Sequence, residues 1–309
     1  MRGSLTGGVL AIGNFEGVHR GHRAVIEAAI ARARELGRPA AALTFEPHPR
    51  SYFNPGDPVF RLSDVGTKLR LFRACGLDGA IVLDFDAALA GLDPAHFVRR
   101  ILVDLFAVGG VVVGYDFHFG HGRGGSPDFL VAEGARHGFS VTIVPPFIEN
   151  GRRISSGLVR AALKRGDVEE AADLLGYPWF VTGEVVHGDK RGRELGYPTA
   201  NIRLDPSCGL RHGVYAVRVG HGGKLYDAVA NFGRRPMFDN GAVLLEAFLF
   251  GFDGDLYGAS LDVAFIGWIR PELTFENIDE LVRRMDDDSA HARTLLARTA
   301  SVPLPPAVP

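Results

Sequence analysis

Short apolar runs alternate with amphipathic stretches through the first half of the chain. The apolar runs are Val9–Ile12, Ala40–Phe45, Ala80–Leu83, Gly110–Gly114 and Val141–Val144. Continuous runs of this length are typical of strands buried on both faces of a parallel sheet. The intervening stretches with helical spacing are Gly21–Leu36, Pro94–Phe106 and Pro127–His137. This alternation predicts a doubly wound α/β domain that binds ligands at the carboxyl ends of its strands.

The pattern changes after two helices expected at Ser156–Arg165 and Val168–Leu175. Strand-like runs then follow one another without helices between them, at Phe180–Val186, Gly213–Val219, Leu225–Phe232, Val243–Phe250 and Ser260–Ile269. Such a series predicts a small antiparallel β-barrel. A helical tail is expected in two pieces, Glu276–Asp286 and Ser289–Arg298. We therefore predict two domains, at residues 1–178 and 179–309.

The composition narrows the class of protein. A chain of 309 residues with 46% hydrophobic and 23% charged residues is typical of a globular protein. Its formal net charge of −2 gives no electrostatic support for a nucleic-acid or membrane partner. No run approaches the roughly 20 apolar residues that span a bilayer, and we expect no signal peptide before the first strand. The two distant cysteines, Cys75 and Cys208, fit a reducing cytoplasm, where we expect the protein. None of these features selects an oligomeric state.

His19 and His22 stand between the first predicted strand and the first predicted helix. Free backbone N–H groups and the helix dipole favour an anion at such a place. Two imidazoles add donors for a phosphate, and Gly21 lets a phosphate approach the main chain. Two ordinary turn histidines are the alternative interpretation of this motif alone.

The segment Ile154–Arg160 leads into another predicted helix. Ser155 or Ser156 can cap that helix or donate to a phosphate oxygen, and Arg160 offers a charged fork. These residue types fit a triphosphate, although a capped helix with a surface arginine is the alternative. The sequence contains no P-loop lysine motif, so phosphate binding would use other means.

The run GEVVHGDKRGRELGYPTAN at residues 183–201 is the strongest single motif. The glycines at 188, 192 and 196 make a flexible loop whose amides can wrap phosphate, and basic side chains add positive charge. Thr199 and Asn201 are oxygen donors of the kind that Mg²⁺ accepts beside nucleotide phosphates. A charged hairpin, the alternative, leaves the order of these residues unexplained.

Glu246 stands within an otherwise apolar strand. A carboxylate in such a place requires a reason, because burying an unpaired charge is unfavourable. A carboxylate within hydrogen-bond reach of a hydroxyl can accept its proton. Glu246 is therefore a candidate general base.

Four motifs of the first half together resemble those of the bacterial bifunctional riboflavin kinase/FAD synthetase family. GNFEGVHRGH at 13–22 resembles GNFDGVHxGH, TFEPHP at 44–49 resembles TFxPHP, GYDFHFG at 114–120 resembles GxDFxFG, and ISSGLVR at 154–160 resembles ISSTxxR. The resemblance implies a nucleotidylyltransferase domain in which the FMN phosphate attacks the α-phosphate of ATP. His19 and His22 would stabilise charge on the phosphates. Asn14, Ser155, Ser156 and Arg160 would position the triphosphate, and Asp116 and Phe117 would line the flavin or adenine pocket.

The second half resembles the riboflavin kinase half of the same family, GxVxxGxxxGRxLGxPTAN. The likeness continues through ANFGRRP at 230–236, LEA at 245–247, DGDLYG at 253–258 and RPE at 270–272. It implies FMN formation from riboflavin and ATP, with Mg²⁺ as cofactor held by Thr199 and Asn201. Glu246 would take the proton of the ribityl 5′-hydroxyl. ATP would contact Gly188, Lys190, Gly192, Arg193 and Gly196, and the flavin would contact Asn231 and Arg293.

The chain departs from the family patterns at Glu16, which replaces an aspartate, at Gly157, which replaces a threonine, and at Met237, which also replaces a threonine. The first two changes predict a working but slow adenylylation, because small misplacements affect rates strongly. Alternative functions are a riboflavin kinase with an impaired adenylyltransferase half, a flavin-binding protein without turnover, and adenylylation of another small substrate.

Overall fold

The computed structural model describes residues 5–187, 196–234, 243–301 and 303–305. The chain divides into two compact units. The first contains residues 1–59, 63–155 and 305–309, and the second contains residues 60–62 and 156–304. The boundary expected near residue 178 stays a prediction. Among the described residues, no helix has the length and apolar character needed to cross a membrane.

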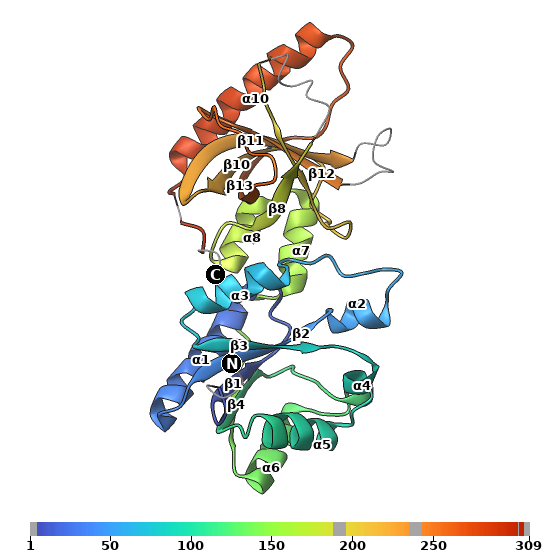
Figure 1. Ribbon diagram of the computed structural model, residues 1–309, viewed down its shortest axis with the longest axis vertical. Helices are drawn as coiled ribbons and strands as arrows, with labels where there is room; N and C mark the ends of the chain where they lie inside the picture. The colour runs from blue at the N-terminus through green and yellow to red at the C-terminus, as the bar shows by residue number, and fades with distance from the viewer. Residues whose placement is uncertain (1–4, 188–195, 235–242, 302, 306–309) are drawn as a thin grey trace. The chain divides into compact units, whose positions relative to one another are not determined.

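The first unit is built on a five-stranded parallel sheet in the order β3-β2-β1-β4-β5 (Figure 1). Its strands are β1 (Val9–Ile12), β2 (Ala40–Glu46), β3 (Gly79–Asp84), β4 (Gly110–Gly114) and β5 (Ser140–Val144). The predicted doubly wound α/β domain is thus confirmed. The strands that follow β1 in the sequence, β2 and β3, lie on one side of it. The later strands β4 and β5 lie on its other side. The carboxyl ends of β1 and β4 therefore flank the switch point, where α/β sheets bind ligands.

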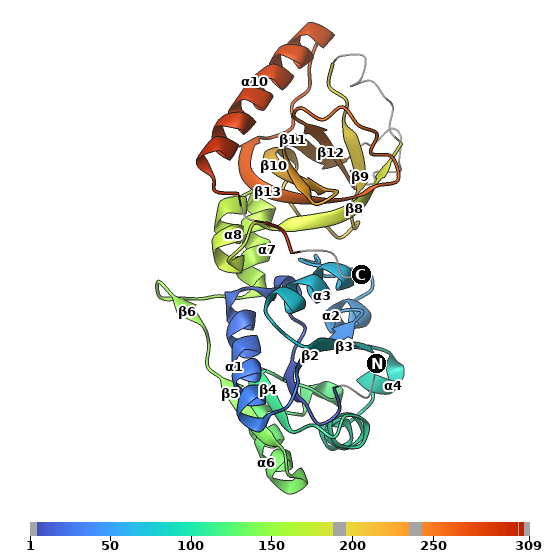
Figure 2. The same cartoon turned by 60° about the vertical axis from the view of Figure 1, so that its left-hand side comes forward.

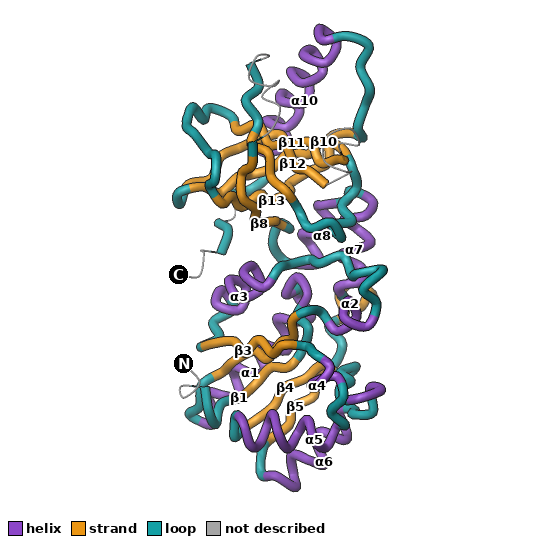
Figure 3. The backbone as a smooth tube through the Cα atoms, turned by 45° about the vertical axis from the view of Figure 1, so that its right-hand side comes forward, coloured by secondary structure: helices purple, strands orange, loops and turns teal. Residues whose placement is uncertain are grey.

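Helices cover both faces of this sheet, and Figure 3 shows them on either side of the orange strands. They are α1 (Arg20–Leu36), α2 (Pro49–Phe53), α3 (Val65–Ala74), α4 (Ala87–Ala90), α5 (Pro94–Phe97) with the π-helical η3 (Val98–Leu105), and α6 (Pro127–His137). Short elements complete the unit: the 3₁₀ turns η2 (Glu16–Val18) and η4 (His121–Arg123), and the hairpin of β6 (Ile148–Glu149) and β7 (Arg152–Arg153). Leu10 and Ile12 of β1 pack with Phe97, Leu102 and other residues in one apolar core.

The sequence pattern did not predict α3. Three polar residues of this helix, Thr67, Lys68 and Arg70, are buried together with Leu71 and Phe72. Polar residues on the buried face weaken the apolar periodicity by which a helix is recognised from sequence.

The second unit is a closed antiparallel barrel with strand order β10-β11-β12-β9-β8-β13 (Figure 2). The strands are β8 (Phe180–Val186), β9 (Ala200–Arg203), β10 (Gly213–His221), β11 (Lys224–Arg234), β12 (Val243–Leu249) and β13 (Ser260–Arg270). The barrel was predicted, but its four-residue strand β9 was not, because Ala200–Arg203 follows a glycine-rich segment and is too short to show a clear alternating pattern. Helices α7 (Ser156–Arg165) and α8 (Val168–Leu175) precede the barrel as expected.

The tail is one continuous helix, α10 (Ile278–Arg298), so the prediction of two helices is wrong. The break was expected at the acidic residues Asp287 and Asp288. Asp288 instead lies buried, where its carboxylate accepts hydrogen bonds from the Arg270 guanidinium at 2.7–3.0 Å. Because this charge is paired with a residue of β13, the helix continues through an acidic segment.

Candidate functional site

The chain makes a strained turn directly after β1. Phe15 and Val18 have positive φ angles of 49° and 39°, and Gly17 has a φ of 70°. The left-handed region is unfavourable for residues with a side chain, and such strain clusters at functional sites. Phe15 is 1% exposed and packs edge-on against Phe72 of α3, with ring centroids 5.3 Å apart. Buried packing therefore holds this turn in its unusual conformation.

His19 and His22 lie together where the turn enters α1. The His19 side chain caps the helix, because its Nδ1 accepts the backbone N–H of His22 at 3.3 Å. The two imidazole rings stack with centroids 3.6 Å apart and planes 17° apart. Since Nδ1 accepts this bond, a neutral His19 carries its proton on Nε2. The motif thus presents two aligned imidazoles at a helix N-terminus, where an anion is favoured.

Gly21 also makes room for this arrangement. A Cβ atom at residue 21 would lie 3.2 Å and 3.3 Å from two atoms of the His19 ring. The same Cβ would lie 3.5 Å from the carbonyl oxygen of Ile154. The serine-rich segment that begins at Ile154 therefore lies beside the start of α1, so Ser155 belongs to the same region as the histidines.

The loop after β4 lies at the other side of the switch point. Asp116 in this loop is exposed, and its carboxylate lies 3.7 Å from the guanidinium of Arg153 in the β6–β7 hairpin. Arg153 also donates a hydrogen bond to the Tyr115 hydroxyl. Phe117 is half-buried and stacks on Phe119, with ring centroids 5.4 Å apart. Arg153 is not among the residues predicted from the sequence, although its position next to the Ile154–Arg160 motif was a signal.

Three other residues predicted to bind the triphosphate lie in the turn after β1 and in α7. Asn14 is exposed in the turn after β1. Ser156 and Arg160 belong to the second unit, at the beginning of α7, where the Arg160 Nε donates to the Phe60 carbonyl at 2.7 Å. Gly157, in the first turn of α7, is exposed.

A cluster of aromatic rings that was not predicted from the sequence lies at the carboxyl ends of β2 and β3. Phe45, Tyr52, Phe53 and Phe85 make edge-to-face contacts with centroids 5.3–6.1 Å apart. Phe53 is 65% exposed, which is unusual for a large apolar side chain. Its signal in the sequence was the aromatic pair Tyr52-Phe53, which follows two residues after the TFEPHP motif.

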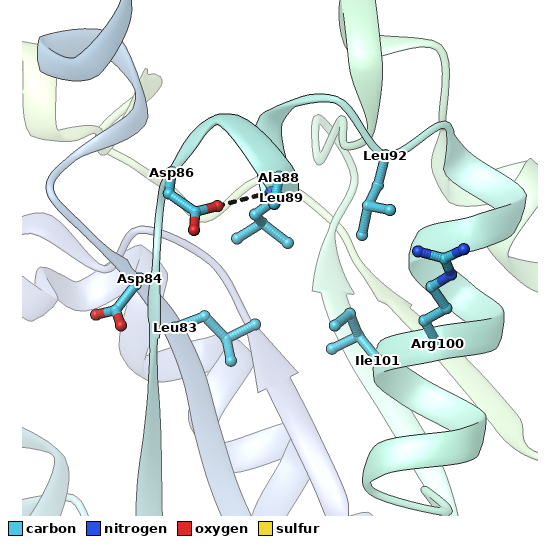
Figure 4. Close-up of a pocket in the computed structure, with 8 residues that line it drawn as sticks. All are labelled: Leu83, Asp84, Asp86, Ala88, Leu89, Leu92, Arg100 and Ile101. Carbon is cyan, nitrogen blue, oxygen red and sulfur yellow. Dashed lines mark hydrogen bonds between the residues drawn. The ribbon is translucent and has the colours of Figure 1, made fainter.

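A pocket of about 300 Å³ opens beside β3 (Figure 4). It is lined by Leu83, Asp84, Asp86, Ala88, Leu89, Leu92, Arg100 and Ile101. Figure 4 shows the leucines and Ile101 forming an apolar floor, with charged groups around them. Because β3 is an edge strand separated from β1 by β2, this pocket lies outside the switch point.

In the second unit, strand pairing aligns three polar residues. Asn231 of β11 is directly opposite Glu246 of β12, which is directly opposite Asn201 of β9. Residues paired in this way point to the same side of a sheet. The neighbouring residues in the same three strands, Phe232, Leu245 and Ile202, are fully buried on the other side. The row therefore joins the predicted base Glu246 to a predicted metal ligand and a predicted flavin contact.

Asn201 is the buried member of this row, at 6% exposure. Its Nδ2 donates to the Thr199 carbonyl at 3.4 Å, while its buried Oδ1 has no hydrogen-bond partner among the described residues. An orphaned amide oxygen beside a carboxylate fits a divalent cation such as Mg²⁺, which prefers hard oxygen ligands. The residues present thus fit the implied metal.

Aromatic and charged side chains surround the end of β12. Tyr197 packs edge-on against Phe248, with centroids 4.9 Å apart, and its hydroxyl bonds to Asp286 of α10. Burial and this contact with Asp286 raise the pKa of Tyr197 to about 12. The Arg293 guanidinium of α10 lies 3.6 Å from the centroid of the Phe250 ring. Arg293 is exposed on α10, and its guanidinium stacks on the ring of Phe250, which lies two residues after Phe248 in the sequence.

Four predicted ATP contacts, Gly188, Lys190, Gly192 and Arg193, and the departure at Met237 lie outside the described residues. Gly196 is described and has a positive φ of 82°, a conformation that favours glycine.

Comparisons with known proteins match the two halves of the chain to two different enzyme families. The family model for FAD synthetase matches residues 2–158, and the model for riboflavin kinase matches residues 175–296. A bifunctional riboflavin kinase/FMN adenylyltransferase from Pseudomonas fluorescens is 40% identical over 97% of this chain and 96% of its own length. The protein of the same name from Escherichia coli K12 is 40% identical over 95% of this chain and 94% of its own.

A crystal structure of a macrolide-efflux protein from Streptococcus pneumoniae is similar throughout. It has 30% sequence identity and a TM-score of 0.83, and it covers 94% of this chain and 95% of its own.

Proposed function

The chain belongs to the bifunctional riboflavin kinase/FMN adenylyltransferase family, and from this premise we propose that it makes both FMN and FAD. The second unit transfers the γ-phosphoryl group of ATP to riboflavin, giving FMN and ADP. The first unit transfers the adenylyl group of ATP to FMN, giving FAD and pyrophosphate. The observation that carries the proposal is that each unit matches one of the two enzyme families and holds its own polar cluster.

In the first unit, we assign adenylyl transfer to the turn after β1. An oxygen of the FMN phosphate attacks the α-phosphorus of ATP, and pyrophosphate leaves with the electrons of the broken P–O bond. His19, His22 and the amides at the start of α1 stabilise the negative charge on the phosphates. Asn14 and Ser155 position the triphosphate, and the family resemblance assigns the same role to Ser156 and Arg160. No protein nucleophile is needed, because positioning and charge stabilisation account for this type of transfer.

We assign the binding of the flavin ring in the first unit to aromatic side chains. Asp116 and Phe117 line the flavin or adenine pocket. The exposed ring of Phe53, supported by Tyr52 and Phe85, offers a second surface on which an aromatic heterocycle can stack. Stacking of a base on an aromatic side chain is worth about 1–3 kcal/mol.

In the second unit, Glu246 acts as general base for the ribityl 5′-hydroxyl as that oxygen attacks the γ-phosphorus of ATP. Thr199 and Asn201 hold Mg²⁺, and the buried Oδ1 of Asn201 supports this assignment. When bound, the metal neutralises charge on the ATP phosphates. Gly188, Lys190, Gly192, Arg193 and Gly196 contact ATP, and Asn231 and Arg293 contact the flavin. Both reactions consume ATP, so we assign the protein to the cytoplasm.

A kinase with an impaired adenylyltransferase half is the principal rival. It rested on the departures at Glu16 and Gly157. Glu16 has an ion-pair partner in α3, and Gly157 lies at an exposed helix start. Neither observation favours the rival over the bifunctional assignment.

The test is to incubate the purified protein with riboflavin, ATP and Mg²⁺ and to separate the flavins by chromatography over time. We expect FMN to appear first and FAD to follow. Accumulation of FMN without FAD would support the rival, and binding of flavin without ATP consumption would indicate a flavin carrier. A parallel reaction with excess EDTA tests the metal requirement, and we expect no product in it.

A further inference from the structure

Helix α3 and the segment that leads into it contact the turn after β1 at three points. Phe72 of α3 packs against Phe15, and the hydroxyl of Ser63, two residues before the helix begins, accepts the backbone N–H of Gly17 at 3.2 Å. The third contact is an ion pair between Lys68 Nζ and Glu16 Oε1 at 3.6 Å. Both of these charged side chains are only 2% exposed. Contacts with α3 and the segment before it therefore hold in place the turn that carries His19 and His22.

Lys68 also reaches the other branch of the turn. Its Nζ donates to Thr44 Oγ1 at 3.5 Å, and that hydroxyl donates to the Asn14 carbonyl at 3.2 Å. Asn14 and Glu16 flank Phe15, whose φ is positive. One ammonium group therefore ties both neighbours of a strained residue to α3 and β2. The strain at Phe15 persists only because such contacts over-determine the turn.

From these contacts we propose that Lys68 is a positioning residue for adenylyl transfer, acting through Glu16 and Thr44 on the turn that carries His19 and His22. Lys68 is too deeply buried to touch a nucleotide, so its effect passes through the turn. The inference rests on the assignment of adenylyl transfer to this turn. It also gives a reason for a longer acid at residue 16, because the carboxylate of Glu16 must reach a partner on a separate helix.

The experiment compares Lys68→Met, Glu16→Gln and the double variant Glu16→Gln/Lys68→Met in the full chain. FAD formation from FMN is measured at saturating and limiting ATP, and FMN formation from riboflavin is measured in the same preparations. We expect Lys68→Met to lower kcat for FAD formation about 100-fold with KM for ATP changed less than threefold, since a misplacement near 1 Å costs about this much. FMN formation stays within twofold of wild type.

The double variant separates positioning from simple destabilisation. Lys68→Met removes the ammonium group beside the buried Glu16 carboxylate, whereas the double variant removes both charges. We expect the kcat of the double variant for FAD formation to be at least tenfold higher than that of Lys68→Met. Thermal unfolding of each variant is followed by circular dichroism, with assays run at least 15 °C below each midpoint. If Lys68→Met does not fold, the double variant carries the test, with an expected kcat about tenfold below wild type and an unchanged KM.

Two results would overturn the inference. One is a kcat for FAD formation within twofold of wild type in Lys68→Met, or in the double variant where that one carries the test. The other is a double variant in which the effects of the two single changes multiply independently. A His22→Gln variant distinguishes this failure from failure of the proposed site. If His22→Gln lowers FAD formation about 100-fold while Lys68→Met leaves it within twofold of wild type, the site stands and the positioning role falls. If His22→Gln also leaves FAD formation unchanged, the assignment of the site itself is wrong.

Discussion

The two units hold their candidate sites by different structural means. In the first unit, the histidines lie on a turn between a parallel strand and a helix, and the turn contains left-handed residues. In the second unit, Asn231, Glu246 and Asn201 lie on the strands themselves, aligned by antiparallel pairing. A loop-borne site needs buried contacts from elsewhere to hold it, whereas a strand-borne site is held by the backbone hydrogen bonds of the sheet. Side chains around the first site should therefore influence activity indirectly more than side chains around the second.

The largest expected effect separates the two units by activity. Glu246→Gln should lower FMN formation from riboflavin about 10³-fold, because a general base contributes about 10²–10⁴-fold. FAD formation from added FMN should remain at the wild-type rate. The matched control is Glu184→Gln, an exposed acid on β8 of the same barrel, which should change neither rate. Equal loss of both activities in Glu246→Gln would contradict the assignment of separate sites.

The converse experiment addresses the first unit. His22→Gln should lower FAD formation about 10²-fold, since removal of one donor to a developing charge costs about 10²–10³-fold. FMN formation is the internal control and should be unaffected. The exposed His96, changed to Gln, serves as a control for loss of an imidazole in the same unit. A His22→Gln protein with normal FAD formation would show that phosphate charge is stabilised elsewhere.

A smaller effect is expected for Asn201, the proposed metal ligand of the strand-borne site. Asn201→Ala should raise the Mg²⁺ concentration needed for half-maximal FMN formation about tenfold, because the amide oxygen that fits the cation is lost. The measurement is a Mg²⁺ titration at constant MgATP. The Mg²⁺ dependence of FAD formation should not move. An unchanged titration for FMN formation would remove Asn201 from the metal site.

The smallest effect concerns the contact between Tyr197 and α10. Tyr197→Phe removes the hydrogen bond to Asp286 and should lower the free energy of unfolding by about 1 kcal/mol. The pKa of Tyr197 is raised by burial and by Asp286 to about 12, from an ordinary value of 10. The stabilisation is therefore complete below pH 10 and is lost as the pH rises from 10 to 12. Urea unfolding of both proteins from pH 6 to 9 should give a constant difference, and a difference that changed with pH in this range would contradict the prediction.

The sequence pattern predicted most of the secondary structure, because local periodicity records which face of each element is buried. The five apolar runs correspond to the five parallel strands, and two of the stretches with 3.6-residue spacing correspond to α1 and α6. The pattern failed where polar residues are buried. Lys68 and Arg70 lie on the buried face of α3, which was not predicted, and the buried Asp288 lies where two helices were expected but α10 continues.

The sequence by itself determined most of the elements and the chemical types of the candidate residues, together with the family to which the motifs belong. Only the tertiary structure decided which of these residues meet. The alignment of Asn201 with Glu246 depends on the pairing of β9 with β12, whose paired positions are 41 to 47 residues apart in the sequence. The pairing of Glu16 with Lys68 depends on the packing of α3 against the turn after β1. Local sequence patterns record which face of an element is buried, but contacts between distant segments arise only when the whole core packs.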